Sequence, residues 1–403
     1  MPSEPHRGVP EDALVQPLEG IQVLDFTQVE MGPVCTQVLG DFGADVIKVE
    51  RPRGGDLSRH KVLPVDGENP VFLALNRNKR GLAIDLKHPQ GRGIVQRLAE
   101  RADVLVHNFR PEVMCRLGLG FDDLREHNPR LVYAHGSGWG PTGPYQHKGG
   151  QDILAQAASG MMMTNALPGG APHKVHNPIA DFTAGMLLVH GILLALLARE
   201  RTGRGQEVYT SLLDGMLATQ IQEATFLLNT GRMLNWGYLP LGNPFPTQDG
   251  HIAVVGAFRP NPLADMCRVL GIEDLSTQPR FATDEARIDH GEELKGLLAD
   301  AFRKRTSAEW LHDLEAADIL CSPINTLEQA LDDPQVRHNG MVIEFEHPQG
   351  TVRGIGSPIK LADTPASVRR APPLLGQHDD EILAELGYAL EHINELRQAG
   401  VVQ

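Results

Sequence analysis

Short apolar runs alternate with stretches of helical spacing along the first half of the chain. Residues 21–26, 44–50, 102–108 and 131–135 are rich in aliphatic and β-branched side chains and end at polar or glycine-containing turns, which is typical of strands. A further strand is indicated over residues 82–86. Between the runs, apolar residues recur at helical spacing. This alternation predicts an α/β fold, a Rossmann-like large domain whose parallel sheet is covered by helices on both faces.

The most apolar stretch of the chain is residues 182–198, which contain no Asp, Glu, Lys or Arg. Pro178 disfavours helix at the residue before it, and Asp181 is a good N-cap, so we expect a buried helix to begin at or just after Asp181. The run falls short of the roughly 20 residues of a membrane span and contains His190, so a core helix is favoured and no membrane contact is expected. Free N–H groups and the helix dipole would favour an ionised Asp181, either as an anion ready for chemistry at neutral pH or as a structural N-cap.

The pattern changes after Gly205. Residues 207–228 indicate one long helix, and residues 231–250 are rich in proline and glycine. A strand at 252–255 and amphipathic helices such as 307–316 then predict a smaller α+β domain. The expected division is a flexible tail (1–16), the first part of the large domain (17–205), a linker helix and loop (206–250), the small domain (251–326), and a return linker with the C-terminal part of the large domain (327–403).

Composition and the absence of common motifs exclude several classes of function. The formal charge is 37 − 51 = −14, which argues against a nucleic-acid surface. The four cysteines lie far apart, so no structural zinc site or other metal site is indicated, and reduced thiols suit a cytoplasmic protein. No G-x-G-x-x-G follows the first strand and no Walker A sequence is present, so a nicotinamide cofactor is not supported.

Two features suggest an anionic ligand. Seven cations, most of them at or just after predicted strand ends, would form a local basic rim, or else solvated surface charge: Arg51, Arg53, Lys79, Arg80, Lys87, Arg110 and Arg116. The glycines before Gln151 and Asp152 could present N–H groups to an oxyanion, or form an ordinary loop capped by Asp152.

Taken together, these motifs resemble those of the class III coenzyme A transferases, the CaiB/BaiF family, and in particular its formyl-CoA transferases. The likeness spans nearly the whole chain, and its specificity comes from the number and order of the motifs. The matching segments are residues 17–21, Leu24-Asp25-Phe26-Thr27, Met31-Gly32-Pro33, 43–50, 76–80, Asn108-Phe109-Arg110-Pro111, 127–130, 152–160, Ala180-Asp181-Phe182, 202–206 and 373–378.

The resemblance implies a mechanism in which Asp181 is the nucleophile. Its carboxylate would attack an acyl-CoA, and CoA would pass through mixed anhydrides and an aspartyl-CoA thioester to a small carboxylic acid. No permanently bound cofactor is implied, because CoA enters as part of the substrate. Arg51 and Arg116 match positions that contact CoA phosphates, and Asn108 and Phe109 match the neighbourhood of the adenine. An interlocked, ring-like homodimer is also implied.

The chain departs from formyl-CoA transferase at positions near the nucleophile. Gln28 and Glu30 replace a histidine and a glutamine, Gln151 replaces a tyrosine, and only Gly242 stands where a glycine-rich lid loop would lie. A second carboxylate at Glu30 should raise one of two pKa values if it lies close to Asp181. The acyl donor and the acceptor are left open by these differences.

Two other functions are compatible with the same resemblance. An α-methylacyl-CoA racemase needs a base on each face of the α-carbon. The racemases of the family carry a histidine where this chain has Gln151, which cannot serve as that base. The second alternative is a catalytically silent CoA-binding protein, which the presence of Asp181 disfavours.

Overall fold

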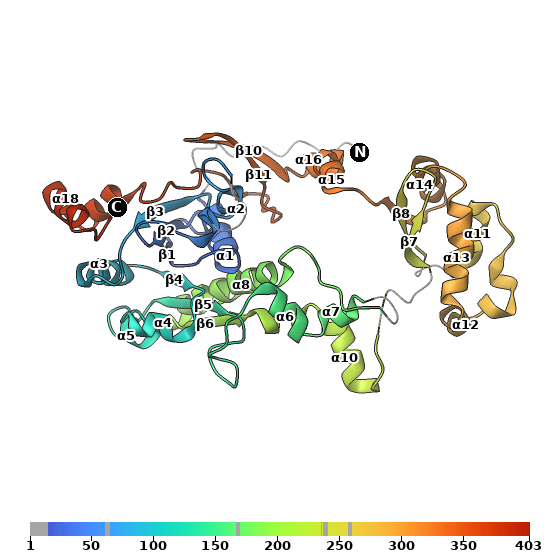
Figure 1. The fold of residues 1–403 in the computed structure, drawn as a ribbon, viewed down its shortest axis with the longest axis horizontal. Coiled ribbons are helices and arrows are strands. Elements are labelled where there is room, and N and C mark those ends of the chain that lie inside the picture. The colour runs from blue at the N-terminus through green and yellow to red at the C-terminus, as the bar shows by residue number, and fades with distance from the viewer. Residues whose placement is uncertain (1–14, 61–64, 167–169, 235, 237–240, 257–259) are drawn as a thin grey trace. The chain divides into compact units, whose positions relative to one another are not determined.

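The computed structural model describes residues 15–60, 65–166, 170–234, 236, 241–256 and 260–403. Most of the expected tail, residues 1–16, therefore lies outside the described residues. The chain divides into a large unit, made of residues 1–220 and 340–403, and a small unit, residues 221–339 (Figure 1). The large unit is thus built from two segments of the chain, and the small unit is inserted between them.

A six-stranded sheet forms the centre of the large unit. Its strands run in the order β3-β2-β1-β4-β5-β6, and every neighbouring pair is parallel. This is the Rossmann order, so the predicted α/β sheet is confirmed. The strands are β1 (Gln22–Asp25), β2 (Asp45–Glu50), β3 (Lys79–Ala83), β4 (Val104–His107), β5 (Val132–Ser137) and β6 (Glu207–Ser211).

Alternate residues of the strands enter two separate cores, as the period of two along a strand requires. Val23, Val46 and Val104 face helices α1 and α8, whereas Leu24, Ile47 and Leu105 face helices on the other side. Both faces are buried, which explains why the strands are nearly continuous apolar runs. The helices of the large unit are α1 (Met31–Asp41), α2 (Pro70–Leu75), α3 (Pro89–Ala99), α4 (Pro111–Arg116), α5 (Phe121–Arg125), α6 (Asp152–Ala158), α7 (Met161–Thr164), α8 (Ile179–Thr202), α9 (Leu212–Ala218), α17 (Asp379–Glu385) and α18 (Leu390–Gln398).

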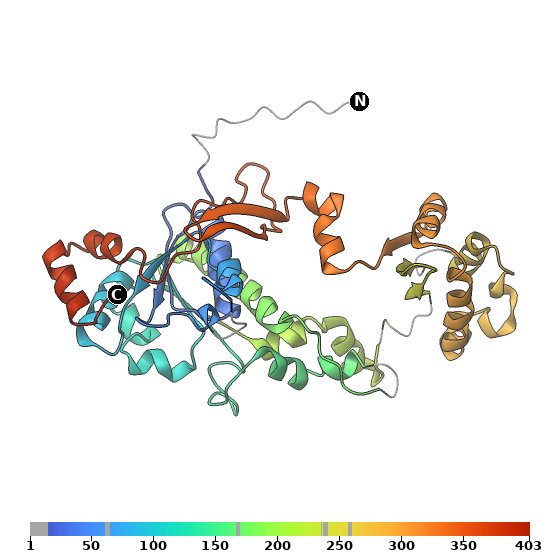
Figure 2. The same ribbon diagram turned by 45° about the horizontal axis from the view of Figure 1, so that its top comes forward.

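The apolar helix α8 begins earlier than the sequence suggests. Pro178 is its N-cap and Ile179 its first residue, so Asp181 lies in the first turn and is not the cap. Proline suits the start of a helix because it has no N–H to leave unpaired. Among the described residues α8 is the one helix whose length and apolar composition would suit a membrane span, a test that core helices also pass. Its contacts with α1, α9, β5 and β6 place it in the core (Figure 2).

The prediction of a single helix over residues 207–228 is wrong. Residues 207–211 form β6, an edge strand paired with β5, and two helices follow it, α9 and α10 (Ile221–Thr230). The strand alternates exposed and half-buried side chains because one edge and part of a face reach solvent. The third strand is also shifted, from the predicted residues 82–86 to β3.

The small unit has its own core around an antiparallel sheet in the order β7-β8-β9. Gly242 is the first residue of β7 and pairs with Val255, so it belongs to a strand; residues 237–240 lie outside the described part of the chain. The elements of this unit after α10 are β7 (Gly242–Pro246), β8 (His251–Val255), α11 (Pro262–Leu270), α12 (Asp284–Asp289), α13 (Gly291–Phe302), α14 (Ser307–Ala316), β9 (Leu320–Pro323), α15 (Leu327–Asp332) and α16 (Pro334–His338).

The second segment of the large unit returns as a hairpin and then covers the edge strand β3. The hairpin consists of β10 (Val342–His347) and β11 (Gly350–Ile355). Further on, the Asp379 carboxylate accepts the Ala83 N–H at 2.8 Å, and Ile84 forms an antiparallel bridge with Val402. Residues distant in sequence therefore complete the sheet at this edge.

Candidate active site

The loops that follow β1 and β4 meet at the carboxyl edge of the sheet. Strand order reverses between these two strands, and in open parallel sheets this is where ligands bind. The Asn108 side chain, just after β4, joins the loops: its Oδ1 accepts the Gln28 N–H at 2.9 Å and its Nδ2 donates to the Gln28 carbonyl at 2.7 Å. Gln28 and Asn108, both predicted site residues, are thus brought together.

Three carboxylates form the centre of the site. Asp152 is the first residue of α6, and its Oδ2 accepts the Ala180 N–H at 2.6 Å and lies 3.3 Å from the Asp181 N. Asp152 therefore caps α8 from outside the helix, which leaves the side chain of Asp181 available for another task. The buried Gln156 holds Asp152 in turn, because its Nε2 donates to the Asp152 Oδ1 at 2.6 Å.

The electrostatics of Asp181 differ from the sequence-based expectation. Burial and the neighbouring Asp152 carboxylate raise the pKa of Asp181 to about 6, although the helix dipole was expected to favour the ionised form. Desolvation outweighs the dipole here. A more basic carboxylate is a better nucleophile while it stays ionised above pH 6.

Glu30 belongs to the same electrostatic cluster. It precedes α1 and is half-buried, and burial together with Asp181 and Asp152 raises its pKa to about 7. The expectation that a second carboxylate near Asp181 has a raised pKa is confirmed. Near pH 7 Glu30 is therefore protonated in about half of the molecules, whereas an isolated glutamate in water would be almost fully ionised.

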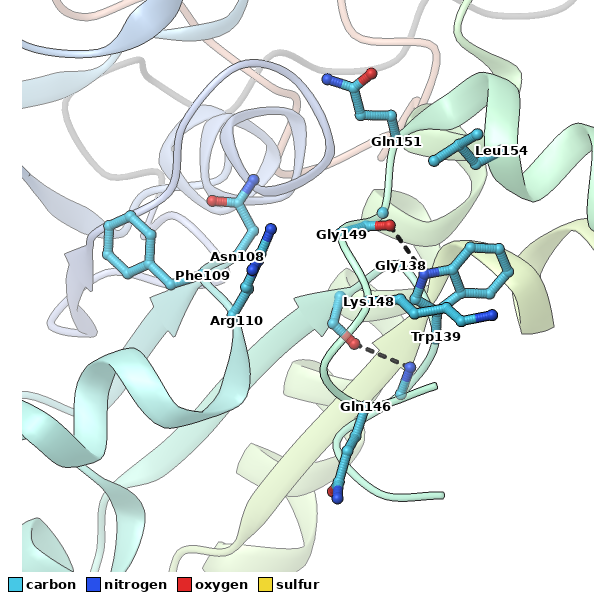
Figure 3. A pocket seen from close by; sticks show the side chains of 13 residues that line it. Asn108, Phe109, Arg110, Gly138, Trp139, Gln146, Lys148, Gly149, Gln151 and Leu154 are labelled. Carbon is cyan, nitrogen blue, oxygen red and sulfur yellow. Dashed lines mark hydrogen bonds between the residues drawn. The ribbon is translucent and has the colours of Figure 1, made fainter. Parts of the chain in front are cut away.

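A pocket of about 330 Å³ lies beside this loop junction (Figure 3). Asn108, Phe109 and Arg110 line it on the β4 side, and Gln151 lines it next to Asp152. The opposite wall is the segment from Ser137 to Gln151, which carries the Trp139 ring and the Lys148 ammonium group. The pocket thus combines two cations, two aromatic rings and polar amides, which suits an anionic ligand with a ring.

Two glycines make the wall of this pocket possible. A Cβ on Gly138 would lie 2.4 Å from the Gly150 Cα, so the backbone segments cross at a distance that no side chain allows. The Trp139 indole N–H also donates to the Gly149 carbonyl at 3.1 Å. The glycines therefore close a loop.

The structure does not gather every predicted residue. Arg51 and Arg116 are exposed and are not among the described residues that line the pocket; Arg51 donates to the Gly55 carbonyl at 3.2 Å. The basic rim is also smaller than predicted. Lys79 and Arg80 are buried in β3 and ion-paired, Lys79 with Asp25 and Arg80 with Asp45, Glu381 and Glu385.

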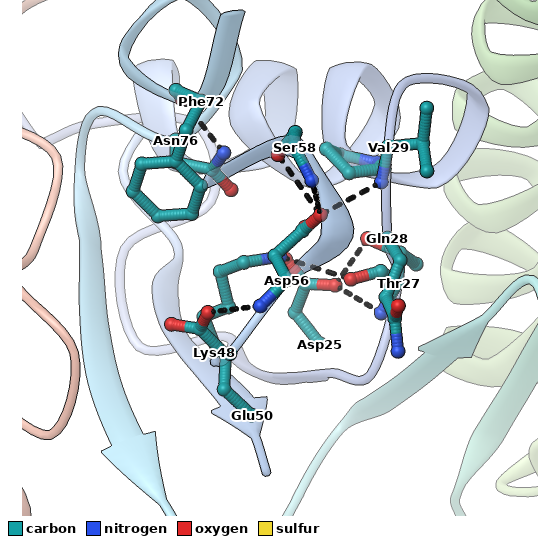
Figure 4. A network of polar contacts seen from close by, with 12 residues as sticks. Asp25, Thr27, Gln28, Val29, Lys48, Glu50, Asp56, Ser58, Phe72 and Asn76 are labelled. Carbon is teal, nitrogen blue, oxygen red and sulfur yellow. Dashed lines mark hydrogen bonds and ion pairs between the residues drawn. The ribbon is translucent and has the colours of Figure 1, made fainter. Parts of the chain in front are cut away.

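Sequence reasoning missed the buried ion pairs beneath the β1 loop. Lys48 pairs with Asp56 at 2.9 Å (Figure 4). Lys79 pairs with Asp25 at 2.9 Å, and all four side chains are fully buried. A signal existed, because Lys48 interrupts an apolar strand that both faces of the sheet bury. A charge at such a place requires a partner.

Comparison with known proteins gives a consistent family. CoA-transferase family III matches residues 18–379. An acyl-CoA transferase of Fusarium pseudograminearum is 38% identical, covering 96% of this chain and 88% of that protein. Human succinyl-CoA:glutarate CoA-transferase is 36% identical (96% and 90% covered), and formyl-CoA:oxalate CoA-transferase of Rhodopseudomonas palustris is 34% identical (96% and 97% covered).

Solved structures support the same relationship. The crystal structure of a CaiB/BaiF family protein from Brucella suis is similar, with a TM-score of 0.83 and 32% identity over 92% of this chain and 99% of that chain. The similarity thus covers the sheet, the site and the small unit, in sequence as well as in fold. This chain belongs to CoA-transferase family III, and it is an enzyme of the CoA-transferase class.

Proposed function

We propose that the protein moves CoA from an acyl-CoA donor to a small carboxylic acid, with Asp181 as the covalent nucleophile. One observation carries this proposal: Asp152 caps helix α8 and Pro178 is its N-cap residue, so the Asp181 side chain is not needed as a cap. Burial and the charge of Asp152 also raise the pKa of Asp181 to about 6. A carboxylate that is basic, half-buried and ionised at neutral pH is suited to attack a thioester.

The proposed steps balance without oxidant, metal or net proton transfer. An Asp181 carboxylate oxygen attacks the thioester carbonyl carbon, the C–S bond breaks, and CoA thiolate and a mixed anhydride form. The thiolate attacks the aspartyl carbonyl carbon and releases the donor acid, which leaves an aspartyl-CoA thioester. The acceptor carboxylate then displaces the thiolate, and the thiolate attacks the acceptor's carbonyl carbon. New acyl-CoA leaves and the Asp181 carboxylate is restored.

The pocket beside the carboxylates supports binding of an acyl-CoA. Arg110 and Lys148 would pair with phosphates and the rings of Phe109 and Trp139 would contact the base, although one face of Phe109 is already near His107, with 6.2 Å between ring centroids. CoA is larger than this pocket. Arg51 and Arg116, both exposed, therefore stay predicted phosphate contacts outside it.

The names of the relatives support a proposal for the class of acceptor. Two of them are named for glutarate and oxalate, which are dicarboxylic acids. We propose a dicarboxylic acid as the acceptor. Succinyl-CoA and formyl-CoA, for which these two relatives are named, are the first donors to test. A cytoplasmic location would supply these substrates, and it is compatible with four cysteines that are not joined in disulfides.

Covalent trapping tests the proposed nucleophile. Incubation with succinyl-, formyl- or acetyl-CoA followed by borohydride should convert Asp181 to homoserine, seen by peptide mass spectrometry, because borohydride reduces an aspartyl thioester. Asp181→Asn is the control and should give no adduct. Turnover of an acyl-CoA by unmodified enzyme without any adduct on Asp181 would contradict the mechanism. Solvent deuterium at the α-carbon of a 2-methylacyl-CoA would instead indicate the racemase.

We also propose that the enzyme is a homodimer. Three leucines of α8 are exposed although the helix is otherwise a core element: Leu193 (40%), Leu194 (66%) and Leu197 (56%). Neighbouring exposed leucines suit a protein interface. Light scattering should give a mass near twice 44.0 kDa, and the double variant Leu194→Glu, Leu197→Glu should fall toward 44.0 kDa. Leu390→Glu, another exposed leucine, is the control. A monomeric wild-type protein would refute the proposal.

A further inference from the structure

Buried or half-buried side chains bind the backbone of three successive residues, 27–29, in the loop between β1 and α1. The Asp25 Oδ1 accepts the Thr27 N–H at 2.8 Å, and the Lys48 ammonium group donates to the Thr27 carbonyl at 2.9 Å. Asn108 binds both the N–H and the carbonyl of Gln28. The Asp56 Oδ1 accepts the Val29 N–H at 3.1 Å (Figure 4). Loops at a surface do not usually have their polar groups satisfied this completely by distant side chains.

The side chains that hold the loop are themselves fixed. Lys48 and Asp56 form an ion pair at 2.9 Å with no solvent exposure on either side chain. Asp56 also accepts the Ser58 N–H at 2.8 Å, which holds its carboxylate in one orientation. A buried ion pair contributes little net stability compared with an apolar pair of the same size, so its presence here calls for another explanation.

Val29 is the part of the loop that needs this support. Its φ is 68°, in the left-handed region that a β-branched residue rarely adopts, and its side chain is 41% exposed. Such a conformation is strained and persists only where the surroundings determine it. Because Val29 lies between Gln28 and Glu30, its left-handed turn sets the direction in which both neighbouring side chains leave the backbone.

We propose that Asn108 and Asp56 are positioning residues: they fix the strained loop Thr27–Glu30 so that Gln28 and Glu30 face the Asp181 nucleophile. This inference rests on the proposed function, since it assigns the loop to the transfer reaction. Asn108 acts through the two hydrogen bonds that its amide makes with Gln28. Asp56 acts through Val29, with Lys48 as the counter-charge that keeps the carboxylate ionised in the interior.

A matched set of variants separates positioning from other roles. Asp56→Asn and Asp56→Ala both lose the ion pair with Lys48, but only the asparagine keeps an acceptor for the Val29 N–H. Asn108→Ala removes both bonds to Gln28 from a half-buried site, so it remains informative if the Asp56 variants fail to fold. Two readouts are needed: hydrogen exchange of a peptide covering residues 26–31, and kcat and KM for acyl-CoA.

We expect the loop peptide to exchange at least tenfold faster in Asn108→Ala and Asp56→Ala, while a peptide of α3 is unchanged. In both variants kcat should fall at least tenfold; in Asp56→Ala, whose residue is outside the lining of the pocket, KM for acyl-CoA should change less than threefold, and Asp56→Asn should recover most of the losses seen in Asp56→Ala. Unchanged exchange in Asn108→Ala, a loosened loop with normal kcat, or a loss confined to KM would each overturn the proposal. The exchange readout needs no chemistry, so a missing adduct on Asp181 in wild-type enzyme would count against the proposed function alone.

Discussion

Asp181→Asn is expected to lower the transfer rate by at least about a thousandfold, because an amide cannot open a thioester as a carboxylate can. The same substitution should stabilise the protein. A folded-state pKa of about 6, raised from 3.8, means that the ionised carboxylate is less favourable in the fold than in the unfolded chain. Loss of function and gain of stability from one side chain are what a buried nucleophile predicts.

The sign of the stability effect depends on pH. Below about pH 3 the group is protonated in both states and contributes almost nothing; above about pH 6 the folded state bears the full cost of the charge, on the order of 1–3 kcal/mol. Asp181→Asn and Asp181→Ala should therefore unfold at higher temperature than wild type at pH 8 and show almost no such gain at about pH 3. Scanning calorimetry at the two pH values measures this.

Asp214 provides the control for these variants. It also lies in the first turn of a helix, α9, where it pairs with the Ser211 hydroxyl at 2.7 Å. Asp214→Asn should leave transfer within a few-fold of wild type. If Asp181→Ala were destabilised at pH 8 by about 1 kcal/mol, as the loss of a cap would be, the structural role would be the correct one.

The second large effect is expected from Glu30→Gln in the pH dependence of transfer. In wild type the rate should rise through about pH 6 as Asp181 ionises and fall through about pH 7 as Glu30 ionises. The decline has a simple cause: an ionised Glu30 repels both the incoming acceptor carboxylate and the anionic transition state. Glutamine resembles the protonated acid, so the variant should keep the rise near pH 6 and lose the decline.

At pH 8.5 wild type would have only a few per cent of Glu30 protonated, so Glu30→Gln should be about tenfold faster or more at that pH. Initial rates from pH 5 to pH 9 measure both limbs. Glu30→Gln removes the charge and keeps the capacity for hydrogen bonding, whereas Glu30→Ala removes both. A comparison of the two variants therefore separates the effect of the charge from that of hydrogen bonding. A decline above pH 7 that persists in Glu30→Gln would show that another group is responsible.

Local patterns predicted the sheet well because its strands are buried on both faces and therefore stand out as apolar runs. The edge strand β6 pairs with one strand only, β5, and its side chains alternate between exposed and half-buried. Helical residues follow directly from Leu212. The local sequence therefore predicts a single helix over both the strand and the helix that follows it. Pairing with β5, a tertiary effect, decides the structure of residues 207–211.

The site shows the same limit. The sequence alone is enough to propose Asp181 as the nucleophile, but it does not give the raised pKa of Asp181, because the helix dipole is a property of the local sequence and burial is a property of the fold. Asp152 caps α8 from a helix 28 residues earlier in the chain, a contact that no local motif reveals. Asn108 lines the pocket, and its amide also binds both backbone groups of Gln28, a contact between two loops that the sequence does not reveal.

The covered edge of the sheet has a consequence for synthesis. Ala83 in β3 and its partner Asp379 are 296 residues apart, and the whole small unit is translated between them. At about 5–20 residues per second, β3 waits on the order of 15–60 s on the ribosome before its partner emerges. During that time β3, whose residues are buried in the finished fold, has an unpaired edge. Chaperones bind such edges, and strands of other nascent chains can pair with them.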